Sequence, residues 1–430
     1  MDSLNELQTS KVLLVGINTG DDELFNYEMT EMVNLCAVLD LVVVETIYQN
    51  LSSVIPATYL GKGKVEEVKA CSESLEVDYI IFNDELSPVQ FRNLSDSLNV
   101  PIFDRTMLIL EIFKVRARTK EATLQVELAE LKYQLPRLAG SYTSLSRIGG
   151  GGGGTAGARR GSGETKLELD RRHIEKRISK LKDELDSIVV SRKTSRKARD
   201  NNAAKTVAFV GYTNAGKSST INALLQMFQN NLDKQVFVKD MLFATLETST
   251  RKIKLPNNLE FLITDTVGFV SHLPHHLIES FKSTLEEITE ADLIIHIVDA
   301  SSPYLELQVA TTNTVLKELG VSEIPTLYAF NKIDVVPNLM FIPKNYEPSI
   351  YISSVTKEGY PELISYIENS LFPNLITSTF LIPFTKGEVY SAIKEKGEVF
   401  ETEYLENGIK TTARLSKYLT SLYREFVINE

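Results

Sequence analysis

The sequence predicts a multidomain α/β protein in which a small N-terminal α/β domain, a helical hairpin, a larger α/β domain and a short C-terminal α/β domain follow one another. Three observations predict it. The chain has 430 residues, enough for several domains of ordinary size. Strand-sized apolar runs alternate with amphipathic stretches in the first hundred residues and again after residue 205. Apolar residues at heptad spacing lie between these two regions.

The composition is that of a soluble globular protein. Hydrophobic residues make up 43% of the chain and charged residues 24%, which excludes a disordered chain and a fibrous repeat. Two cysteines, Cys36 and Cys71, are too few for a disulfide framework and lie in helix-like surroundings, which indicates a reducing compartment. The N-terminus lacks a signal peptide pattern, and the apolar runs are too short to cross a membrane. We therefore expect a cytoplasmic monomer without a membrane partner.

Residues 1–113 are expected to form the N-terminal α/β domain. Four short apolar runs predict strands, and the helical spacing of apolar residues between them is typical of a parallel sheet. The expected strands are 11–17, 40–47, 77–82 and 100–104.

Residues 114–200 are expected to form two long helices that pack as an antiparallel pair. Apolar residues recur three and four positions apart, so each helix has one apolar seam whose obvious partner is the other seam. The seam residues are Leu124, Leu128, Leu131 and Leu135, then Ile174, Ile178, Leu181, Leu185 and Ile188. Between the helices, the glycine-rich stretch 146–164 predicts a loop, and the polar stretch 191–205 predicts a linker.

This hairpin is basic, although the whole chain has a formal net charge of -11. Residues 114–200 contain 21 Lys and Arg against 11 Asp and Glu, and a cationic surface confined to one segment indicates a polyanionic partner. Two alternatives stay open: the charges only keep the helices soluble, or the glycine-rich loop is a plain linker and does not order on a target. The candidate contacts are Arg147, Arg159, Arg160, Arg171, Arg172, Lys176 and Arg177.

A phosphate-binding loop opens the larger α/β domain, which is expected over 204–372. The strand-like run 206–210 leads into G-x-x-x-x-G-K-S and then a helical stretch, the context that this motif requires. Its N–H groups face phosphates, Lys217 adds a positive charge for the β and γ phosphates, and the Ser218 hydroxyl is a magnesium ligand. The predicted nucleotide contacts are Gly211, Tyr212, Thr213, Asn214, Ala215, Gly216, Lys217, Ser218 and Ser219.

A D-x-x-G motif follows downstream. Asp265 ends an apolar run and can hold magnesium through a water, while the N–H of Gly268 can detect a γ-phosphate. The motif is weak alone, but its place after the phosphate loop is where a nucleotide-binding fold has it.

The polar segment 243–250, between these two motifs, can close over a γ-phosphate, with Phe243 as a nucleotide contact. Thr245 is our choice for the second hydroxyl ligand of magnesium, and Thr248 and Thr250 are alternatives. The expected Mg²⁺ ligands are Ser218, Thr245 and Asp265.

The identity of the base is indicated by the N-K-x-D motif after the apolar run 326–330. Asn331, Lys332 and Asp334 form this motif, and the Asp334 carboxylate can accept hydrogen bonds from the N1–H and the amine of guanine. Adenine presents the wrong donors at that edge, so the nucleotide is expected to be GTP or GDP. Further predicted contacts are Ser353, Ser354 and Val355.

The last part of the chain, 373–430, is expected to form a small α/β domain of strand, helix, strand and strand. The expected strands are 380–384, 398–405 and 409–415.

These motifs and several longer segments resemble the HflX family of translational GTPases along almost the whole chain. The segments that carry the resemblance, beyond the nucleotide motifs, are 61–68, 82–94, 121–138, 163–178 and 265–287. The resemblance implies a Ras-like domain that hydrolyses GTP, flanked by the other three domains. It also implies that the chain binds the large ribosomal subunit, reaches its rRNA near the peptidyl-transferase centre, and splits or rescues stalled ribosomes under stress.

The chain departs from the usual family pattern in four places. The glycine run 149–154 is longer, GSGE stands where G-P-G-E is common, LETST lacks a usual proline, and SSV replaces the usual S-A. The first two departures concern how the loop tip contacts RNA and do not affect the nucleotide chemistry.

Two residues bear on the reaction. Phe269 stands where Ras-like enzymes often have the glutamine that orients the attacking water, so we expect slow hydrolysis that the ribosome accelerates. Asn214 resembles a residue that holds potassium in a subset of such GTPases, so K⁺ is a second candidate cation, with a polar filler residue as the alternative. The expected catalytic residues are Lys217, Gly268 and Asn214.

Other functions stay open at this point. The main alternative is an RNA-binding scaffold with a structural, unhydrolysed nucleotide, and a GTPase that serves RNA modification ranks last because no Cys or His cluster suits transfer chemistry. The GKGK stretch 61–64 is too short to indicate ATP binding on its own. The histidines His272, His275 and His276 are attributed to a helix near the switch, and His173 and His296 are interpreted as structural.

Overall fold

The computed structural model describes residues 10–138, 159–197, 205–228, 249–271, 277, 281–321, 323–336, 343 and 345–428. Some residues singled out above lie outside these ranges, namely Arg147, Phe243, Thr245, Thr248, His272, His275 and His276. The side chains of Arg159 and Arg160 also lie outside the description. The chain forms two compact units. In the described part, the first holds residues 10–138, 159–197 and those of Gly268–Thr284, and the second holds the rest.

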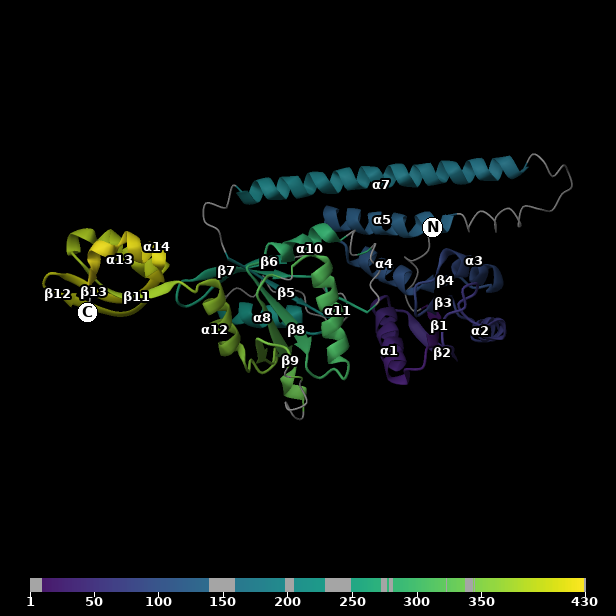
Figure 1. Cartoon of the computed structure of the whole chain (residues 1–430), viewed down its shortest axis with the longest axis horizontal. Helices are drawn as coiled ribbons and strands as arrows, with labels where there is room; N and C mark the ends of the chain where they lie inside the picture. The colour runs from purple at the N-terminus through teal and green to yellow at the C-terminus, as the bar shows by residue number, and fades with distance from the viewer. Residues whose placement is uncertain are drawn as a thin grey trace. The chain divides into compact units, whose positions relative to one another are not determined.

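The N-terminal domain is built on a four-stranded parallel sheet with strand order β2-β1-β3-β4, which confirms the predicted parallel sheet (Figure 1). Alternate residues of β1 share a core with helices α2 and α3, and α1 contacts α4. The elements are β1 Lys11–Asn18, α1 Asp22–Val38, β2 Val42–Asn50, α2 Lys62–Ser74, β3 Tyr79–Phe82, α3 Pro88–Ser97, β4 Ile102–Asp104 and α4 Arg105–Arg116.

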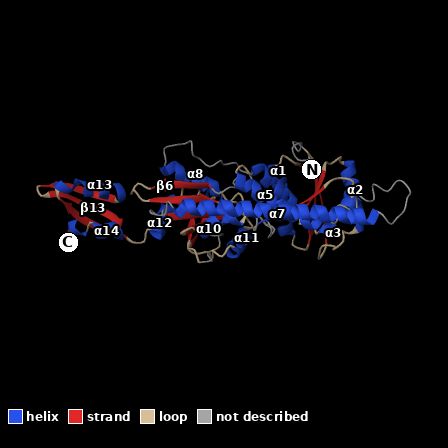
Figure 2. Cartoon of the chain, turned by 90° about the horizontal axis from the view of Figure 1, so that it is seen from above, coloured by secondary structure: helices blue, strands red, loops and turns tan. Residues whose placement is uncertain are grey.

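Helices α5 (Lys120–Gln134) and α7 (Arg159–Lys197) lie side by side and antiparallel, as predicted (Figures 1 and 2). Their seams meet in one apolar cluster, which consists of Leu124, Leu128, Leu181 and Leu185 with Leu131, Ile178 and Ile188 packed against it. Of the predicted seam, Leu135 and Ile174 fall outside this cluster. Leu135 instead begins the 3₁₀ turn η1 (Leu135–Arg137), because α5 ends one residue earlier.

Two predicted boundaries around α7 are wrong. The helix begins at Arg159, inside the stretch predicted as a loop, and it ends at Lys197, inside the stretch predicted as a linker. Glycine costs a helix only about 1 kcal/mol per residue relative to alanine, and elongation of an established helix is easier than its nucleation. Gly161 and Gly163 therefore do not stop α7.

The base of the hairpin is tied to the N-terminal sheet by a buried carboxylate at the end of β4. Asp104 accepts hydrogen bonds from the Tyr133 hydroxyl at 2.6 Å, from the Leu86 N–H at 3.0 Å and from the Met107 N–H at 2.9 Å. Burial raises the pKa of Asp104 to about 6, although these hydrogen bonds act in the opposite direction. Arg137 stacks on the Tyr133 ring, with its guanidinium carbon 3.5 Å from the ring centroid.

The larger α/β domain has a six-stranded sheet of order β10-β9-β8-β5-β7-β6, parallel except for β6. The phosphate loop, Asp265 and Asn331 come at the carboxyl ends of three of these strands, β5, β7 and β9, where α/β sheets bind their ligands. The elements are β5 Lys205–Gly211, α8 Lys217–Phe228, β6 Ser249–Lys254, β7 Glu260–Asp265, α10 Lys282–Thr289, β8 Leu293–Asp299, α11 Leu305–Glu318, β9 Thr326–Asn331, η4 Ile333–Val335, β10 Ser349–Tyr351 and α12 Tyr360–Leu371.

The C-terminal domain is an antiparallel sheet of order β12-β13-β11-β14 with helices on one face. The predicted first strand 380–384 is misplaced, because β11 starts earlier and ends before Pro383, which has no N–H to pair. Helix α14 and strand β14 were not predicted. The elements are β11 Leu375–Ile382, η6 Phe384–Lys386, α13 Gly387–Lys396, β12 Glu398–Leu405, β13 Gly408–Ser416, α14 Lys417–Leu422, η7 Arg424–Phe426 and β14 Val427–Ile428.

Among the helices that the structure describes, not one has the length and apolar content needed to span a bilayer.

The hydroxyl of Tyr133 is expected to stabilise the junction between hairpin and sheet. Tyr133→Phe should lower the free energy of unfolding by about 1.5–3 kcal/mol, because the buried Asp104 carboxylate then loses the hydrogen bond that the Tyr133 hydroxyl donates to it. Urea unfolding of the full chain measures this. Tyr48→Phe, at a half-exposed ring, is the control and should change stability by less than about 0.5 kcal/mol. Equal effects of the two substitutions would contradict the prediction.

Candidate nucleotide site

The phosphate loop takes a conformation that only glycine allows at two positions. Gly211 has φ +147°, and a Cβ there would lie 2.2 Å from the Ile297 carbonyl oxygen. Gly216 has φ +94°, and a Cβ there would lie 2.1 Å from Nδ2 of Asn331. Both backbones therefore pack directly against neighbouring strands, which is why the motif needs glycine at its two ends.

Lys217 is held inside this loop. Its Nζ donates hydrogen bonds to the carbonyl oxygens of Gly211 at 2.9 Å and Tyr212 at 2.8 Å, and the residue is only 6% exposed. Burial lowers the pKa of Lys217 to about 8, while the nearby Asp265 raises it in part. These two hydrogen bonds hold the ammonium at the loop, and an anion that enters the loop would favour its charged form.

The two described residues of the predicted magnesium set lie together. The Ser218 hydroxyl donates to Oδ2 of Asp265 at 2.8 Å, and Asp265 is fully buried at the end of β7. The next residue, Thr266, donates to the carbonyl of Phe209 at 2.7 Å and so fixes the end of β7 on β5. A hydroxyl and a carboxylate are oxygen donors of the kind that Mg²⁺ prefers, so the pair fits this ion. Of the alternatives, Thr250 lies in β6, where its hydroxyl contacts Thr264.

Asn331 joins the phosphate loop to the loop that follows β10. Its Nδ2 donates to the carbonyl of Ala215 at 2.9 Å, and its Oδ1 accepts from the backbone N–H of Ser354 at 3.1 Å and from the hydroxyl of Ser354 at 2.9 Å. Thr220 of α8 donates to the Gly216 carbonyl and contacts the Ser354 hydroxyl at 3.2 Å. The phosphate-binding and base-recognition loops are therefore one hydrogen-bonded assembly.

Two residues of the N-K-x-D motif, Lys332 and Asp334, each bond to a polar side chain from another part of the chain. The Ser353 hydroxyl donates to Oδ1 of Asp334 at 2.6 Å and accepts from the N–H groups of Val355 and Thr356. Lys332 has φ +67° and its Nζ lies 2.7 Å from Oδ2 of Asp299.

Two residues that sequence reasoning missed support this arrangement, Thr220 and Asp299. Neither belongs to a nucleotide motif, although Asp299 ends an apolar strand in the same way as Asp265 does.

The other predicted residues differ in burial and in the compact unit to which they belong. Tyr212 and Thr213 are buried in the loop, whereas Asn214 is exposed with φ +60°, and Val355 is exposed after the base-recognition loop. Ser219 is partly buried at the start of α8. Gly268 belongs to the first compact unit and directly follows the last residue of the second, so the unit boundary falls inside the D-x-x-G motif.

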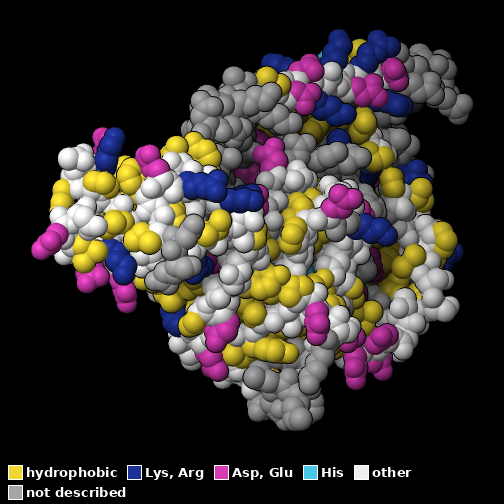
Figure 3. Space-filling model, turned by 60° about the vertical axis from the view of Figure 1, so that its left-hand side comes forward, with side chains coloured by type: hydrophobic (Ala, Val, Ile, Leu, Met, Phe, Trp, Pro, Cys, Tyr) yellow, Lys and Arg dark blue, Asp and Glu magenta, His cyan; other side chains and the backbone are white. Residues whose placement is uncertain are grey.

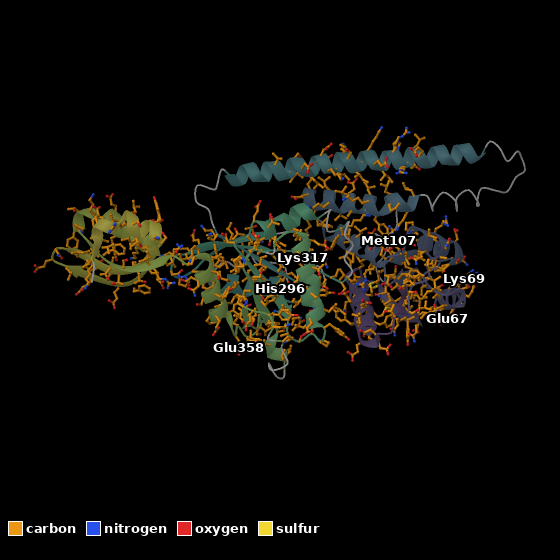
Figure 4. All side chains as sticks on the ribbon, viewed as in Figure 1. Glu67, Lys69, Met107, His296, Lys317 and Glu358 are labelled. Atoms are coloured by element: carbon orange, nitrogen blue, oxygen red, sulfur yellow. The ribbon has the colours of Figure 1, made fainter. Side chains whose placement is uncertain are left out.

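His296 lies within the central strand β8 (Figure 4). Burial lowers its pKa to about 3, with Lys217 acting in the same direction, so the imidazole is neutral at physiological pH. Its ring packs on Tyr328, with centroids 5.2 Å apart. Among the described residues, no cluster of His, Cys, Asp or Glu is arranged to hold a metal ion.

The cationic residues of α7 differ in how they are engaged. Arg171 and Arg172 are exposed and pair with Glu175 and Glu168 of their own helix, whereas Arg177 makes a bidentate bond across the hairpin to Glu127 at 2.6 and 2.7 Å. Lys176 is exposed. The Lys and Arg side chains gather with acidic ones along the ridge formed by α7, at the top of Figure 3.

Close packing of Gly216 against Asn331 leads to a substitution test. Gly216→Ala should weaken nucleotide binding about tenfold or more, because the added Cβ overlaps Nδ2 of Asn331 and the φ is unfavourable for alanine. Gly320→Ala is a matched control, since Gly320 has φ +75° with no atom within 4 Å of an added Cβ. Titration calorimetry measures both variants. If both variants lost the same affinity, the effect would come from the positive φ alone, and the overlap with Asn331 would not explain it.

The lowered pKa of Lys217 predicts how binding depends on pH. Phosphate binds the protonated lysine, so the affinity for GDP should fall as pH rises through about 8, by up to about tenfold per unit. Equilibrium binding between pH 7 and 9 measures this. Guanosine, which has no phosphate, serves as the control and should show no such decline. A GDP affinity that stays constant over this range would contradict the prediction.

Three family descriptions match this chain in order. "GTP-binding GTPase N-terminal" matches residues 26–114, "GTP-binding GTPase Middle Region" matches 116–199, and "50S ribosome-binding GTPase" matches 206–332. Together they cover the N-terminal sheet, the hairpin and most of the nucleotide domain.

Relatives of known name extend the match to the whole chain. The GTPase HflX of Caldanaerobacter subterraneus subsp. tengcongensis is 42% identical over 431 residues, which cover 100% of this chain and 96% of that protein. The GTPase HflX of Lacrimispora saccharolytica is 41% identical over 95% of this chain and 94% of its own. A solved GTP-binding protein from Sulfolobus solfataricus, in complex with GDP, aligns over 84% of this chain and 98% of its own at 24% identity and a TM-score of 0.43. On the evidence of the full-length identity and the three matched regions, this chain belongs to the HflX family of GTPases.

Proposed function

We propose that this GTPase uses bound GTP to favour one arrangement of its N-terminal unit, in which the hairpin binds rRNA of the large ribosomal subunit, and that it splits or rescues stalled ribosomes. One observation carries the proposal. The chain that follows Asp265 passes at Gly268 from the unit with the phosphate loop into the unit with the hairpin. A change at the γ-phosphate therefore acts directly on the unit that carries the cationic surface.

The proposed site residues divide the chemistry among them. The N–H groups of the phosphate loop and Lys217 bind the β and γ phosphates, and Gly268 detects the γ-phosphate. Ser218 and Asp265, with Thr245 as a third proposed ligand, would hold Mg²⁺, which neutralises charge on the phosphates when bound. Asn214 is exposed at the loop, where it could contribute to holding K⁺. Asp334 recognises guanine, with Ser353 holding its carboxylate in orientation.

Hydrolysis is proposed to be slow without the ribosome. Phe269 is 1% exposed and apolar, so its side chain cannot orient an attacking water by hydrogen bonding. The ribosome would supply the missing group or order the segment that contains Thr245. Release of phosphate then resets the N-terminal unit.

The proposed RNA contacts are the exposed cations Arg171, Arg172 and Lys176 of α7, together with Arg147, Arg159 and Arg160 near the hairpin tip. Arg177 ranks behind them, because its guanidinium already serves Glu127 across the hairpin. We further propose the domain boundaries 1–113, 114–200, 204–372 and 373–430, and a cytoplasmic monomer.

Recognition of guanine can be tested at Asp334. Asp334→Asn should shift the preference from GDP towards XDP, because an amide donates where the carboxylate accepted, and the second carbonyl of xanthine replaces the guanine amine as its partner. Competition binding of the two nucleotides to both proteins measures the shift. A ratio that does not change would exclude Asp334 from base recognition.

The ribosome role can be tested by reversing three charges on α7. In the triple variant Arg171→Glu, Arg172→Glu and Lys176→Glu, binding to large subunits should weaken and its logarithmic salt slope should flatten by about two to three. The matched control reverses three lysines of the second unit, Lys254, Lys317 and Lys394. Sedimentation with subunits under GTP and GDP measures both.

Turnover distinguishes the alternatives in the same experiment. GTP hydrolysis should be slow for the protein alone and faster with subunits. A bound nucleotide that is never hydrolysed, with or without ribosomes, would favour the RNA-binding scaffold instead. An unchanged salt slope in the α7 variant would remove these residues from the interface.

A further inference from the structure

The segment that follows the D-x-x-G motif is anchored on the N-terminal domain. Ser271, three residues after Gly268, offers its backbone carbonyl to Nη1 of Arg105 at 3.3 Å. Farther along, Leu277 and Phe281 are buried, and the Phe281 ring packs edge-on against Phe113 of α4, with centroids 5.0 Å apart. Within the described part of Gly268–Thr284, Ser271 and Phe281 thus each contact a residue of the N-terminal domain.

Arg105 is positioned by the N-terminal domain itself. It is 1% exposed, and Nη1 pairs with the Glu31 carboxylate at 2.7 Å. Its Nε donates to the Asn83 carbonyl at 2.7 Å, and Nη2 donates to the Asn83 side-chain oxygen at 2.9 Å. These three bonds are shorter than the 3.3 Å bond to Ser271. The guanidinium would therefore stay in place if the Ser271 carbonyl moved away, at the loss of only its longest hydrogen bond.

We infer that Arg105 is a positioning residue of the GTPase, and that its bond to the Ser271 carbonyl is a latch that GTP must release and GDP need not. The inference rests on the proposed function, since it needs Gly268 to bind the γ-phosphate. When GTP draws the Gly268 N–H towards its γ-phosphate, it pulls on Ser271, three residues later, which is bonded to Arg105. GDP has no γ-phosphate and makes no such demand. The latch thus lowers the affinity for GTP relative to GDP.

The latch also lies beside the base of the hairpin. Arg105 is the first residue of α4, and the residue before it, Asp104, is the carboxylate that holds Tyr133 of α5. Two adjacent residues at the start of α4 therefore make these contacts: Arg105 bonds to Ser271, and Asp104 bonds to Tyr133 of the hairpin. Release of Ser271 therefore removes a contact at the same turn of α4 that bonds to the hairpin.

The test compares two nucleotides on the full chain. In the double variant Arg105→Met and Glu31→Met, a buried ion pair is replaced by apolar side chains, so no charge is left buried without its partner. Affinity for a non-hydrolysable GTP analogue should rise about three- to tenfold relative to wild type, while affinity for GDP stays unchanged. Fluorescence titration measures both affinities.

A second variant keeps the test independent of that double substitution. Arg105→Lys keeps a cation beside Glu31 but replaces the planar fork by one ammonium, so the Ser271 carbonyl loses its oriented donor. The affinity ratio should shift in the same direction. Val68→Ala is the control, because it loosens the buried core of α2 without touching the latch, and it should leave the ratio of the two affinities as in wild type.

The Arg105 variants test the latch, whereas nucleotide binding by the wild-type protein tests the proposed function. GDP binding that persists with an unchanged GTP-to-GDP ratio in both Arg105 variants would overturn the latch, and so would a loss of GTP affinity. A shift of equal size in Val68→Ala would reduce Arg105 to a structural role. Failure of the wild-type protein to bind either nucleotide would instead overturn the proposed function.

Discussion

The hydrogen bonds of the Asn331 carboxamide are the interaction on which the nucleotide site depends. A buried amide must satisfy its donors and its acceptor within the protein, and Asn331 does so by joining the carbonyl of Ala215 to the backbone and hydroxyl of Ser354. Asn331 thereby links the phosphate loop to the loop that follows β10. A ligand that meets both loops at once loses less free energy to ordering, because the protein has already been ordered.

The nucleotide motifs are divided between the two compact units along the chain. The phosphate loop, Asp265 and the N-K-x-D motif belong to one compact unit, in which β5, β7 and β9 are strands of one sheet. Immediately after Val267, two residues beyond Asp265, the chain becomes part of the other unit. The D-x-x-G motif therefore contains a covalent link between the two units, on which the proposed function depends.

Sequence patterns are clearest where the residues of a motif lie close together in the chain. Spacing in the sequence identifies the glycines of the phosphate loop, Lys217 and the motif around Asn331. The sheet then brings the carboxyl ends of their strands to one edge. Prediction was weaker where the deciding partner is distant in the chain. Nothing near Arg177 indicates that it serves Glu127, 50 residues away, and nothing near Arg105 indicates Ser271, 166 residues away. Helix boundaries also failed, since Gly161 and Gly163 weaken a helix without ending it.

By itself, the sequence indicated most of the strands and helices and the nucleotide motifs that they carry. Motif spacing gives the order of the expected phosphate, metal and base contacts, and apolar periodicity predicts the parallel sheet and the hairpin seam. Only the tertiary structure decided which unit owns the segment after Gly268, and which cations face solvent rather than a neighbouring helix. The physical reason is that hydrogen bonds and ion pairs depend on distances of a few ångströms between side chains, and such distances exist only once remote segments have packed together.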